Sequence, residues 1–481
     1  MQKTFVTNLL ITLITNLLVK PFWIFGIDRT IQNRVGVENY GAYANLFTFS
    51  LVLSVLLDLG INNYNTSTLA RNANKLSNQF IPLLFIKFLC GLLYVLLTVI
   101  LGSWYGFSEH QLWLVFLLAV NQLLAHISTF FRSTLTGLQQ YRAEAVISAT
   151  DRLVMSIAGV SLLLFTILPI SIQSFIYIQT VGYASAVIIS FIVLLPALKK
   201  LSFTIQLPRL TSIFRQALPF ALLALLMMLY SKLDVLLIKK LMQNADQENG
   251  IYAQGLRLVD AANMFGAMIA GLLLPMYANI IRKKNELSSL IQVGLFAMLT
   301  PIIVIVVFVI FNATQVIEIL YHQYTNYSLE VFRWAVLTII PTGVIGIFGT
   351  LLTAKSNMKV LLITSALGLV LNLSLNLYLI PQFGAWGSAV SAVGTLTFVA
   401  FIYVIVSIQQ MQLDTMVSLL FRYFWFGILN AAVILTCQKL GLHFIVSTIC
   451  YGLSAIAFVF LLRIISVAQL KKFSISFTNK I

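Results

Sequence analysis

Charged side chains are scarce in this sequence and account for only 9% of its 481 residues. Soluble domains carry about 25% charged residues, so the composition argues against a soluble globular enzyme. Acidic residues are especially few: 14 Asp and Glu stand against 30 Lys and Arg, which gives a formal net charge of +16. That basic excess is diluted in apolar sequence, which argues against a disordered or nucleic-acid-binding protein.

Cysteine is also rare, and Cys90, Cys437 and Cys450 neither suit a disulfide scaffold nor show a zinc-ligand spacing. Motifs for phosphate and metal chemistry are missing too: there is no Gly-x-x-x-x-Gly-Lys loop for ATP, no His-Glu-x-x-His and no Asp-x-Asp. No connection between apolar segments exceeds about 20 residues, whereas polytopic polymerases typically carry a large external loop. We therefore expect a non-enzyme without a cofactor. A membrane glycosyltransferase or polymerase is the least favoured alternative.

Long apolar runs are abundant, with 60% hydrophobic residues and a mean hydropathy of +0.96. A spanning helix needs roughly 20 mostly apolar residues, and unbroken runs favour helices over the alternating strands of a barrel. We predict an all-α integral membrane protein with about fourteen spans. The predicted spans are 6–27, 41–63, 79–102, 110–131, 152–169, 173–196, 216–240, 250–276, 288–311, 331–353, 358–380, 384–408, 417–436 and 442–466.

The distribution of Lys and Arg predicts the orientation of these spans. Both termini and the even-numbered connections hold 20 of the 30 basic residues, among them Arg132, Arg142 and Arg152, whereas the odd-numbered connections hold 6. Cytoplasmic connections carry the excess of basic residues, so we expect both termini in the cytoplasm. That orientation requires an even number of spans, which agrees with fourteen.

An internal repeat divides the predicted spans into two sets of six. The segment VENYGAYANL at 37–46 resembles QENGIYAQGL at 247–256, and each precedes an even-numbered span. Parallel repeats of this kind are one known transporter design. We predict an N-terminal lobe at 1–198, a basic connection at 199–215, a C-terminal lobe at 216–410, and two additional spans with a tail at 411–481.

Charged residues inside the predicted spans are the candidate functional residues. A charge at the middle of a spanning helix costs about 2.5–3.5 kcal/mol on insertion scales, so its presence indicates a function by default. The cations are Lys20, Lys87, Lys232 and Arg257, and the carboxylates are Asp58, Asp234 and Asp260. They are concentrated in corresponding helices of the two halves, spans 1 and 7 and spans 2 and 8.

Each candidate also has a structural interpretation. Lys87 is close enough to the start of its span to extend to the membrane interface. Lys232 and Asp234 are two residues apart and lie on different helix faces, whereas Arg257 and Asp260 are three apart and can form a salt bridge. Asp58 has no cation in its own span.

Asp58 and Pro21 are candidates for two other roles, coupling of transport to an ion and gating. An unpaired, desolvated carboxyl at Asp58 would favour its protonated form, which suits coupling to a proton. Alternatively, Asp58 accepts backbone hydrogen bonds where the helix breaks at Gly60. Pro21 removes a backbone hydrogen bond beside Lys20 and can kink the first helix, so it is a candidate gate, although membrane helices ordinarily tolerate proline.

Several stretches of sequence resemble the polysaccharide transporter family of the multidrug/oligosaccharidyl-lipid/polysaccharide exporter superfamily, whose members include O-antigen and repeat-unit flippases. The similar segments are NLLVKPFWIFGIDRTIQNRVGVENYGAY at 16–43, LLDLGINNYN at 56–65, SKLDVLLIKKL at 231–241, NGIYAQGLRLVDAANMF at 249–265 and YLIPQFGAWGSAVSAVGTL at 378–396. The resemblance implies two six-helix lobes around a central cavity that opens alternately to either side of the membrane.

The resemblance also implies a function. The substrate would be a polyprenyl-pyrophosphate-linked oligosaccharide of O-antigen, capsule or exopolysaccharide, flipped to the outer leaflet of a bacterial cytoplasmic membrane. Lys20, Lys232, Arg257 and Lys87 would then be substrate-binding candidates, because Lys and Arg are phosphate partners. Asp58, Asp234 and Asp260 would be candidates for coupling to H⁺ or Na⁺.

The expected partners are the lipid-linked oligosaccharide, membrane lipids and polysaccharide polymerase or assembly proteins, with no nucleic acid. The main alternative is a small-molecule or multidrug exporter of the same superfamily. Exporters of cationic compounds would be disfavoured by a cavity richer in Lys and Arg than in carboxylates.

Overall fold

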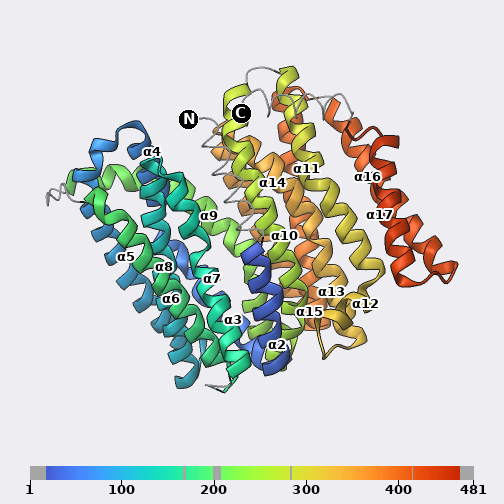
Figure 1. Cartoon of the computed structure of the whole chain (residues 1–481), viewed down its shortest axis with the longest axis horizontal. Helices are drawn as coiled ribbons and strands as arrows, with labels where there is room; N and C mark the ends of the chain where they lie inside the picture. The colour runs from blue at the N-terminus through green and yellow to red at the C-terminus, as the bar shows by residue number, and fades with distance from the viewer. Residues whose placement is uncertain (1–17, 166–168, 199–206, 282–283, 414, 466–481) are drawn as a thin grey trace. The chain divides into compact units, whose positions relative to one another are not determined.

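The computed structural model describes residues 18–165, 169–198, 207–281, 284–413 and 415–465, and all regular elements in these ranges are helices (Figure 1). This confirms the predicted all-α class. The elements are η1 (Phe22–Asp28), α2 (Arg29–Val35), α3 (Val37–Leu53), η2 (Ser54–Leu57), α4 (Ile61–Arg71), η3 (Ala73–Lys75), α5 (Leu76–Tyr105), α6 (Glu109–Gly137), α7 (Tyr141–Phe165), α8 (Ile172–Leu198), α9 (Leu207–Leu241), α10 (Ala245–Ile280), α11 (Lys284–Phe311), α12 (Ala313–Leu320), α13 (Asn326–Leu337), α14 (Ile339–Ala354), α15 (Met358–Met411), α16 (Thr415–Lys439) and α17 (Phe444–Leu461).

Within the described residues, 12 helical segments are long and apolar enough to cross a membrane. One of them, α15, is 54 residues long and covers two of the predicted spans, which join at a sharp kink at Gly384 (φ 58°). The first predicted span, 6–27, lies largely outside the described residues. The number fourteen therefore stays a prediction.

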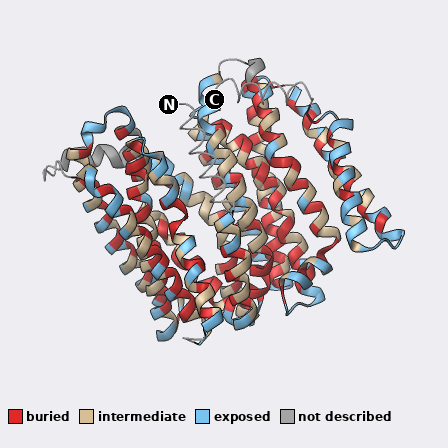
Figure 2. Cartoon of the chain, viewed as in Figure 1, coloured by how far each residue is buried: buried red, intermediate tan, exposed pale blue. Residues whose placement is uncertain are grey.

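The chain divides into two compact units, residues Met1–Gly250 and Ile251–Ile481. The predicted lobes at 1–198 and 216–410 and the remainder at 411–481 stay predictions, and residues 199–206 of the connection are not described. In the first unit, helices α3 to α8 pack into a bundle whose buried faces point inward (Figure 2). Exposed Phe, Leu and Ile side chains on α5 and α8 fit a helix surrounded by lipid.

The first described helix changes its hydrogen-bond register at Pro21. Residues 18–21 are α-helical, and the following turn, Phe22–Asp28, is a π-helix that Pro21 precedes directly. Proline cannot donate a backbone hydrogen bond, so the α-helical pattern is interrupted there and a wider turn follows. The predicted irregularity at Pro21 therefore takes the form of a π-helical turn, and its role as a gate stays a prediction.

The helix that follows is broken between α3 and α4. A short 3-10 turn, Ser54–Leu57, ends α3, and α4 begins after Gly60, which adopts a left-handed conformation at φ 79°. Leu59 also has a positive φ of 43°. The break leaves backbone carbonyls without helical partners, so polar side chains are needed to satisfy them.

The two copies of the predicted repeat contact each other within the first unit. A Cβ on Gly41, in α3, would lie 1.7 Å from the carbonyl oxygen of Asp246 at the start of α10. Conversely, a Cβ on Gly250 would lie 1.9 Å from the carbonyl oxygen of Val37. Both backbones therefore approach as closely as only glycine allows.

Candidate functional site

A cluster of three cations and two carboxylates lies inside the first unit. The charges of Arg132, Asp151, Arg152 and Glu144 all act on the ammonium group of Lys20, which is half-buried. Lys20 comes from the helix before the π-helical turn, Arg132 from α6, and the others from α7. Three separate helices thus bring cations together in an otherwise apolar bundle.

Two aromatic rings hold Arg152 in this cluster. Its guanidinium carbon lies 5.8 Å from the centre of the Trp23 ring and 5.6 Å from that of Tyr183. Arg152 also donates a 3.3 Å hydrogen bond to the Tyr183 hydroxyl. Trp23 in turn stacks on Phe175 at 5.7 Å. A planar guanidinium between two rings has a defined orientation at little entropic cost.

The other arginine of the cluster is paired. Arg132 donates to the Glu144 carboxylate from Nε at 3.0 Å and from Nη2 at 2.6 Å, which ties α6 to α7. Asp151 lies 3.9 Å from Arg152 along the same helix. The three cations exceed the two carboxylates by one positive charge.

The sequence interpretation missed four members of this cluster. It assigned Arg132 and Arg152 to cytoplasmic connections, but both lie within helices: Arg132 in Glu109–Gly137 and Arg152 in Tyr141–Phe165. The predicted span boundaries lie where the apolar runs end, whereas the helices continue through charged turns, and the cytoplasmic location of the two arginines stays a prediction. Glu144 and Asp151 were not considered, although Val146, Leu153 and Ile157 recur on one helical face and could have extended the helix.

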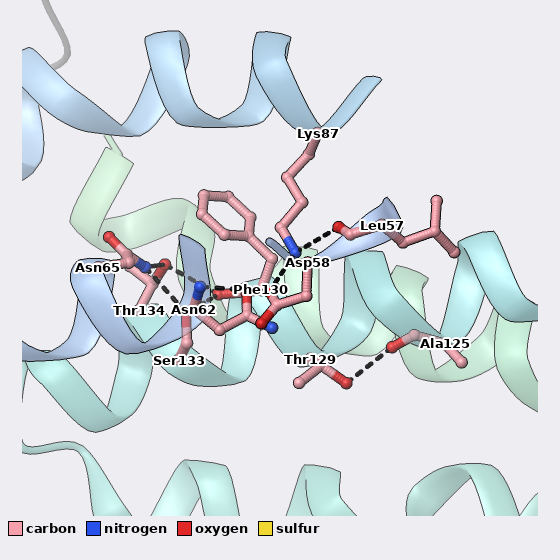
Figure 3. Close-up of polar contacts among 10 residues, drawn as sticks. All are labelled: Leu57, Asp58, Asn62, Asn65, Lys87, Ala125, Thr129, Phe130, Ser133 and Thr134. Carbon is pink, nitrogen blue, oxygen red and sulfur yellow. Dashed lines mark hydrogen bonds and ion pairs between the residues drawn. The ribbon is translucent and has the colours of Figure 1, made fainter. Parts of the chain in front are cut away.

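A second ionic site lies at the break between α3 and α4. Lys87, on α5, donates to the Asp58 carboxylate at 2.7 Å and to the Leu57 carbonyl oxygen at 2.8 Å (Figure 3). The Lys87 side chain is 2% exposed, so it does not extend to the interface. The expectation that Asp58 is unpaired is therefore wrong, because its partner comes from the next span.

Asp58 also accepts a backbone hydrogen bond at the helix break, as its structural interpretation predicted. Its carboxylate accepts a 3.3 Å hydrogen bond from the Asn62 backbone N–H, in the first turn of α4. Beyond that turn, the Asn65 amide donates to the hydroxyls of Ser133 and Thr134 at 2.9 and 2.8 Å, which ties α4 to α6 (Figure 3). The charges of Lys87 and Asp58 both act on His126, also on α6.

The remaining candidates lie elsewhere. Lys232 is half-buried and Asp234 is 1% exposed, both on α9 in the first unit. Arg257 and Asp260, on α10 in the second unit, form the expected salt bridge with an N–O distance of 3.5 Å. The first unit thus brings Lys20 together with Arg132 and Arg152, which the sequence analysis did not propose as site residues. It also pairs Lys87 with Asp58. No His, Cys, Asp and Glu cluster among the described residues could hold a metal ion.

Comparison with known proteins identifies the family and the fold of the chain. A family model described as polysaccharide biosynthesis protein matches residues 5–281. Among solved structures, the chain is similar to the lipid II flippase MurJ in an inward closed conformation, with a TM-score of 0.60 and 14% identity over 89% of this chain and 97% of that one. No curated protein matches the sequence.

Two transporter structures have similar folds. One is an inward-facing multidrug resistance MATE family transporter of the MOP superfamily, with a TM-score of 0.62 and 12% identity over 83% of this chain and 94% of that one. The other is the Vibrio cholerae MATE transporter VcmN in the bent form, with a TM-score of 0.54 and 16% identity over 85% and 98%.

At these identities the solved structures establish the fold, which is that of MurJ and MATE transporters. The family model covers more than half of the sequence, from the first apolar run to the end of α10. The predicted family is thereby confirmed, and all of the similar segments except 378–396 lie within the matched residues. The chain belongs to the polysaccharide biosynthesis protein family.

Proposed function

We propose that this protein is a flippase that moves a polyprenyl-pyrophosphate-linked oligosaccharide from the inner to the outer leaflet by alternating access. The observation that carries the proposal is the cluster of Lys20, Arg132 and Arg152 among apolar helices of a polysaccharide biosynthesis protein. The substrate would be a repeat unit of O-antigen, capsule or exopolysaccharide. The membrane would be the bacterial inner membrane, with both termini in the cytoplasm.

The physical problem that such a protein solves is the transfer of a charged headgroup through hydrocarbon. An unpaired buried charge costs many kcal/mol, so the diphosphate needs fixed cations along its path. Arg152 suits this role because Trp23 and Tyr183 hold its guanidinium. Its nearest carboxylate, that of Asp151, is 3.9 Å away. Lys20 adds a second point charge beside it. Charge-assisted hydrogen bonds to phosphate contribute about 1.5–3 kcal/mol each.

The pair of Asp58 and Lys87 is the best-supported candidate for coupling transport to an ion. Protonation of Asp58 would remove the partner of a buried ammonium group, so the two states of this pair differ in charge at the helix break. In the proposal H⁺ is therefore favoured over Na⁺ at this pair. Asp234 and Asp260 remain further candidates for coupling, and Lys232 and Arg257 remain candidates for substrate contacts.

Replacement of the cluster cations tests the proposal. We expect Arg152→Gln and Lys20→Ala to weaken binding of a radiolabelled polyprenyl diphosphate to purified protein by about 10- to 100-fold, which corresponds to the loss of one charge-assisted contact. Arg34→Gln is the matched control, because Arg34 is exposed on α2 and lies outside the cluster. Thermal unfolding of each variant in detergent shows whether the fold is retained.

The same protein in proteoliposomes distinguishes the alternatives. We expect outward movement of a fluorescent polyprenyl-diphosphate oligosaccharide and no accumulation of the cationic dye ethidium. Ethidium transport without lipid movement would support the multidrug exporter instead. Wild-type affinity in both cluster variants would contradict the assignment of the site, and sugar incorporation by the purified protein would indicate a glycosyltransferase.

A further inference from the structure

An apolar groove lies on the outside of the first unit, beside the cation cluster. It has a volume of about 570 Å³ and lies between the first described helix and α7. Leu18, Val19 and Phe22 form one wall. The other wall is formed by Leu153, Ser156, Ile157, Val160 and Ser161, which follow each other at helical spacing on one face of α7.

The groove differs from an ordinary lipid-facing surface in two respects. The smaller residues Ser156, Val160 and Ser161 share this face of α7 with the large exposed side chains of Leu153 and Ile157, and the surface is concave there. The Ser156 side chain is only 6% exposed, and its hydroxyl forms no hydrogen bond with any group that the structure describes.

One end of the groove adjoins the cation cluster. Leu153 directly follows Arg152 on α7, and Val19 and Phe22 flank Lys20 on the opposite helix. From there the groove extends along α7 toward Ser161, away from the cluster. At a rise of 1.5 Å per residue, the eight steps from Leu153 to Ser161 extend roughly 12 Å along the helix. The cation cluster therefore lies at one end of an apolar groove.

We propose that this groove holds the isoprenoid chain of a polyprenyl diphosphate whose diphosphate is bound by Lys20 and Arg152. The inference rests on the proposed function and adds the path of the lipid chain. The charge of the cluster complements a phosphate headgroup, and the single channel suits a lipid with one chain. A phospholipid carries two acyl chains, and the groove would leave one of them in the bilayer.

Crosslinking from within the groove tests this inference. A photoreactive phenylalanine analogue at Ile157, which is 61% exposed in the groove, should crosslink to radiolabelled polyprenyl diphosphate in nanodiscs. The matched control is the same analogue at Ile188 on α8, which is 58% exposed outside the groove. We expect at least tenfold more crosslinked lipid from position 157. A 100-fold excess of phosphatidylglycerol should leave the crosslink in place.

Filling the groove provides a second measurement. Ser161→Phe should weaken binding of a long-chain polyprenyl diphosphate at least tenfold and leave binding of inorganic pyrophosphate unchanged, because only the chain is displaced. Ser374→Phe, on an exposed face of α15, is the control for adding an aromatic ring to a lipid-facing helix. Ser161 is preferred to the more buried Ser156, since the larger side chain can be accommodated more easily there.

The outcomes separate the groove from the proposed function. If the wild type does not bind polyprenyl diphosphate at all, both the proposed function and the inference are wrong. If it binds the lipid, but positions 157 and 188 crosslink equally and Ser161→Phe binds normally, only the groove is wrong. A crosslink removed by phosphatidylglycerol would overturn the inference in favour of a phospholipid site.

Discussion

Lys87 is a lysine that the fold keeps in its interior as part of an ion pair. Two charges in a low-dielectric interior are expensive to desolvate, and only good geometry compensates for the cost. Here the ammonium group has two acceptors, the Asp58 carboxylate and the Leu57 carbonyl oxygen. The carbonyl belongs to the 3-10 turn at the helix break, so the same lysine satisfies a backbone group that the break exposes. The pair therefore stabilises the helix break between α3 and α4 as well as the buried ammonium group of Lys87.

A double-mutant cycle on this pair separates its structural role from any role in transport. Asp58→Asn and Lys87→Met should each lower the free energy of unfolding by about 3–5 kcal/mol, because each leaves its partner without a counter-charge. The double variant should recover most of that loss. Thermal or denaturant unfolding in a fixed detergent measures all four proteins. Additive losses in the double variant would contradict a direct interaction.

Transport by the double variant then addresses ion coupling. If the pair couples transport to protons, a stable Asp58→Asn, Lys87→Met protein should lose acceleration of lipid movement by a pH gradient. Unchanged acceleration would assign the pair a structural role alone. The readout is the rate of lipid movement with and without an imposed gradient.

Residues that interact across helices were the hardest to predict from the sequence. Lys87 and Asp58 were both identified as costly intramembrane charges, yet nothing in the local spacing indicated that one is the partner of the other, because 29 residues separate them. Arg257 and Asp260 were predictable as a pair, since three residues on one helix define their geometry. Arg152 was missed because its aromatic partners come from two other helices.

Among the helices, the first described one is unusual in its backbone. Its α-helical turn ends at Pro21, and a π-helical segment of seven residues follows. Trp23 and Ile27, both in that segment, are buried against the bundle, so the wider turn is packed in place. Lys20 lies directly before the change of register. The helix thus carries a cluster cation at its most irregular point.

Removing the proline should regularise this helix. We expect Pro21→Ala to raise the melting temperature, because proline is about 3 kcal/mol less favourable than alanine inside a helix. The same change should slow lipid movement severalfold if the irregular turn serves as a gate. Differential scanning fluorimetry and the proteoliposome assay measure the two effects. A stabilised protein with undiminished transport would exclude Pro21 as a gating residue.

Helix existence was predictable and helix ends were not. The apolar runs matched α5, α8 and α11 closely, because a chain in lipid must satisfy its backbone hydrogen bonds within each helix. Helix α7 begins at Tyr141, eleven residues before the predicted start of the span at 152. Its first turns carry Arg142, Glu144 and Asp151, which hydropathy treats as a connection. Charges satisfied by neighbouring helices make such turns compatible with the bundle.

The two copies of the predicted repeat also approach each other closely through their backbones. Gly41 and Gly250 occupy corresponding places in the two copies of the repeat, and each approaches backbone near the other copy. Asn39 and Asn249 each donate a side-chain hydrogen bond to a backbone carbonyl oxygen, those of Val35 and Val235. Sequence similarity over ten residues suggested the repeat, and the contact gives a physical reason for its glycines.

Adding one methyl group at this contact should be costly. We expect Gly250→Ala to destabilise the protein by about 1–3 kcal/mol, because a Cβ would meet the Val37 carbonyl oxygen and the backbones must separate. Gly271→Ala is the control, since no atom lies within 4 Å of its Cβ position. Alanine there should be neutral or stabilising by up to about 1 kcal/mol. Equal melting temperatures for the two variants would refute the close contact.

The all-helical membrane class could be predicted from composition, whereas the joining of two spans in α15 could not. An apolar chain of this length with few carboxylates had to form a helical membrane protein, and the similarity of short segments identified the family. The sequence separated this region into the predicted spans 358–380 and 384–408, but it did not indicate that they join in one kinked helix, α15, at Gly384. Packing determines such features, and hydropathy does not record packing.

Movement of the π-helical turn that follows Pro21 would rotate the side chain of Lys20 about the helix axis. A π segment amounts to one extra residue inserted in an α-helix, and each α-helical residue accounts for about 100° of turn. If the extra residue moved along the helix past Lys20, that side chain would rotate by about 100° without any change in helix length. The ammonium group would leave the side of Arg152 and face a different neighbour. In the proposed function, such a screw-like step in the backbone would release the bound diphosphate, with the surrounding bundle at rest.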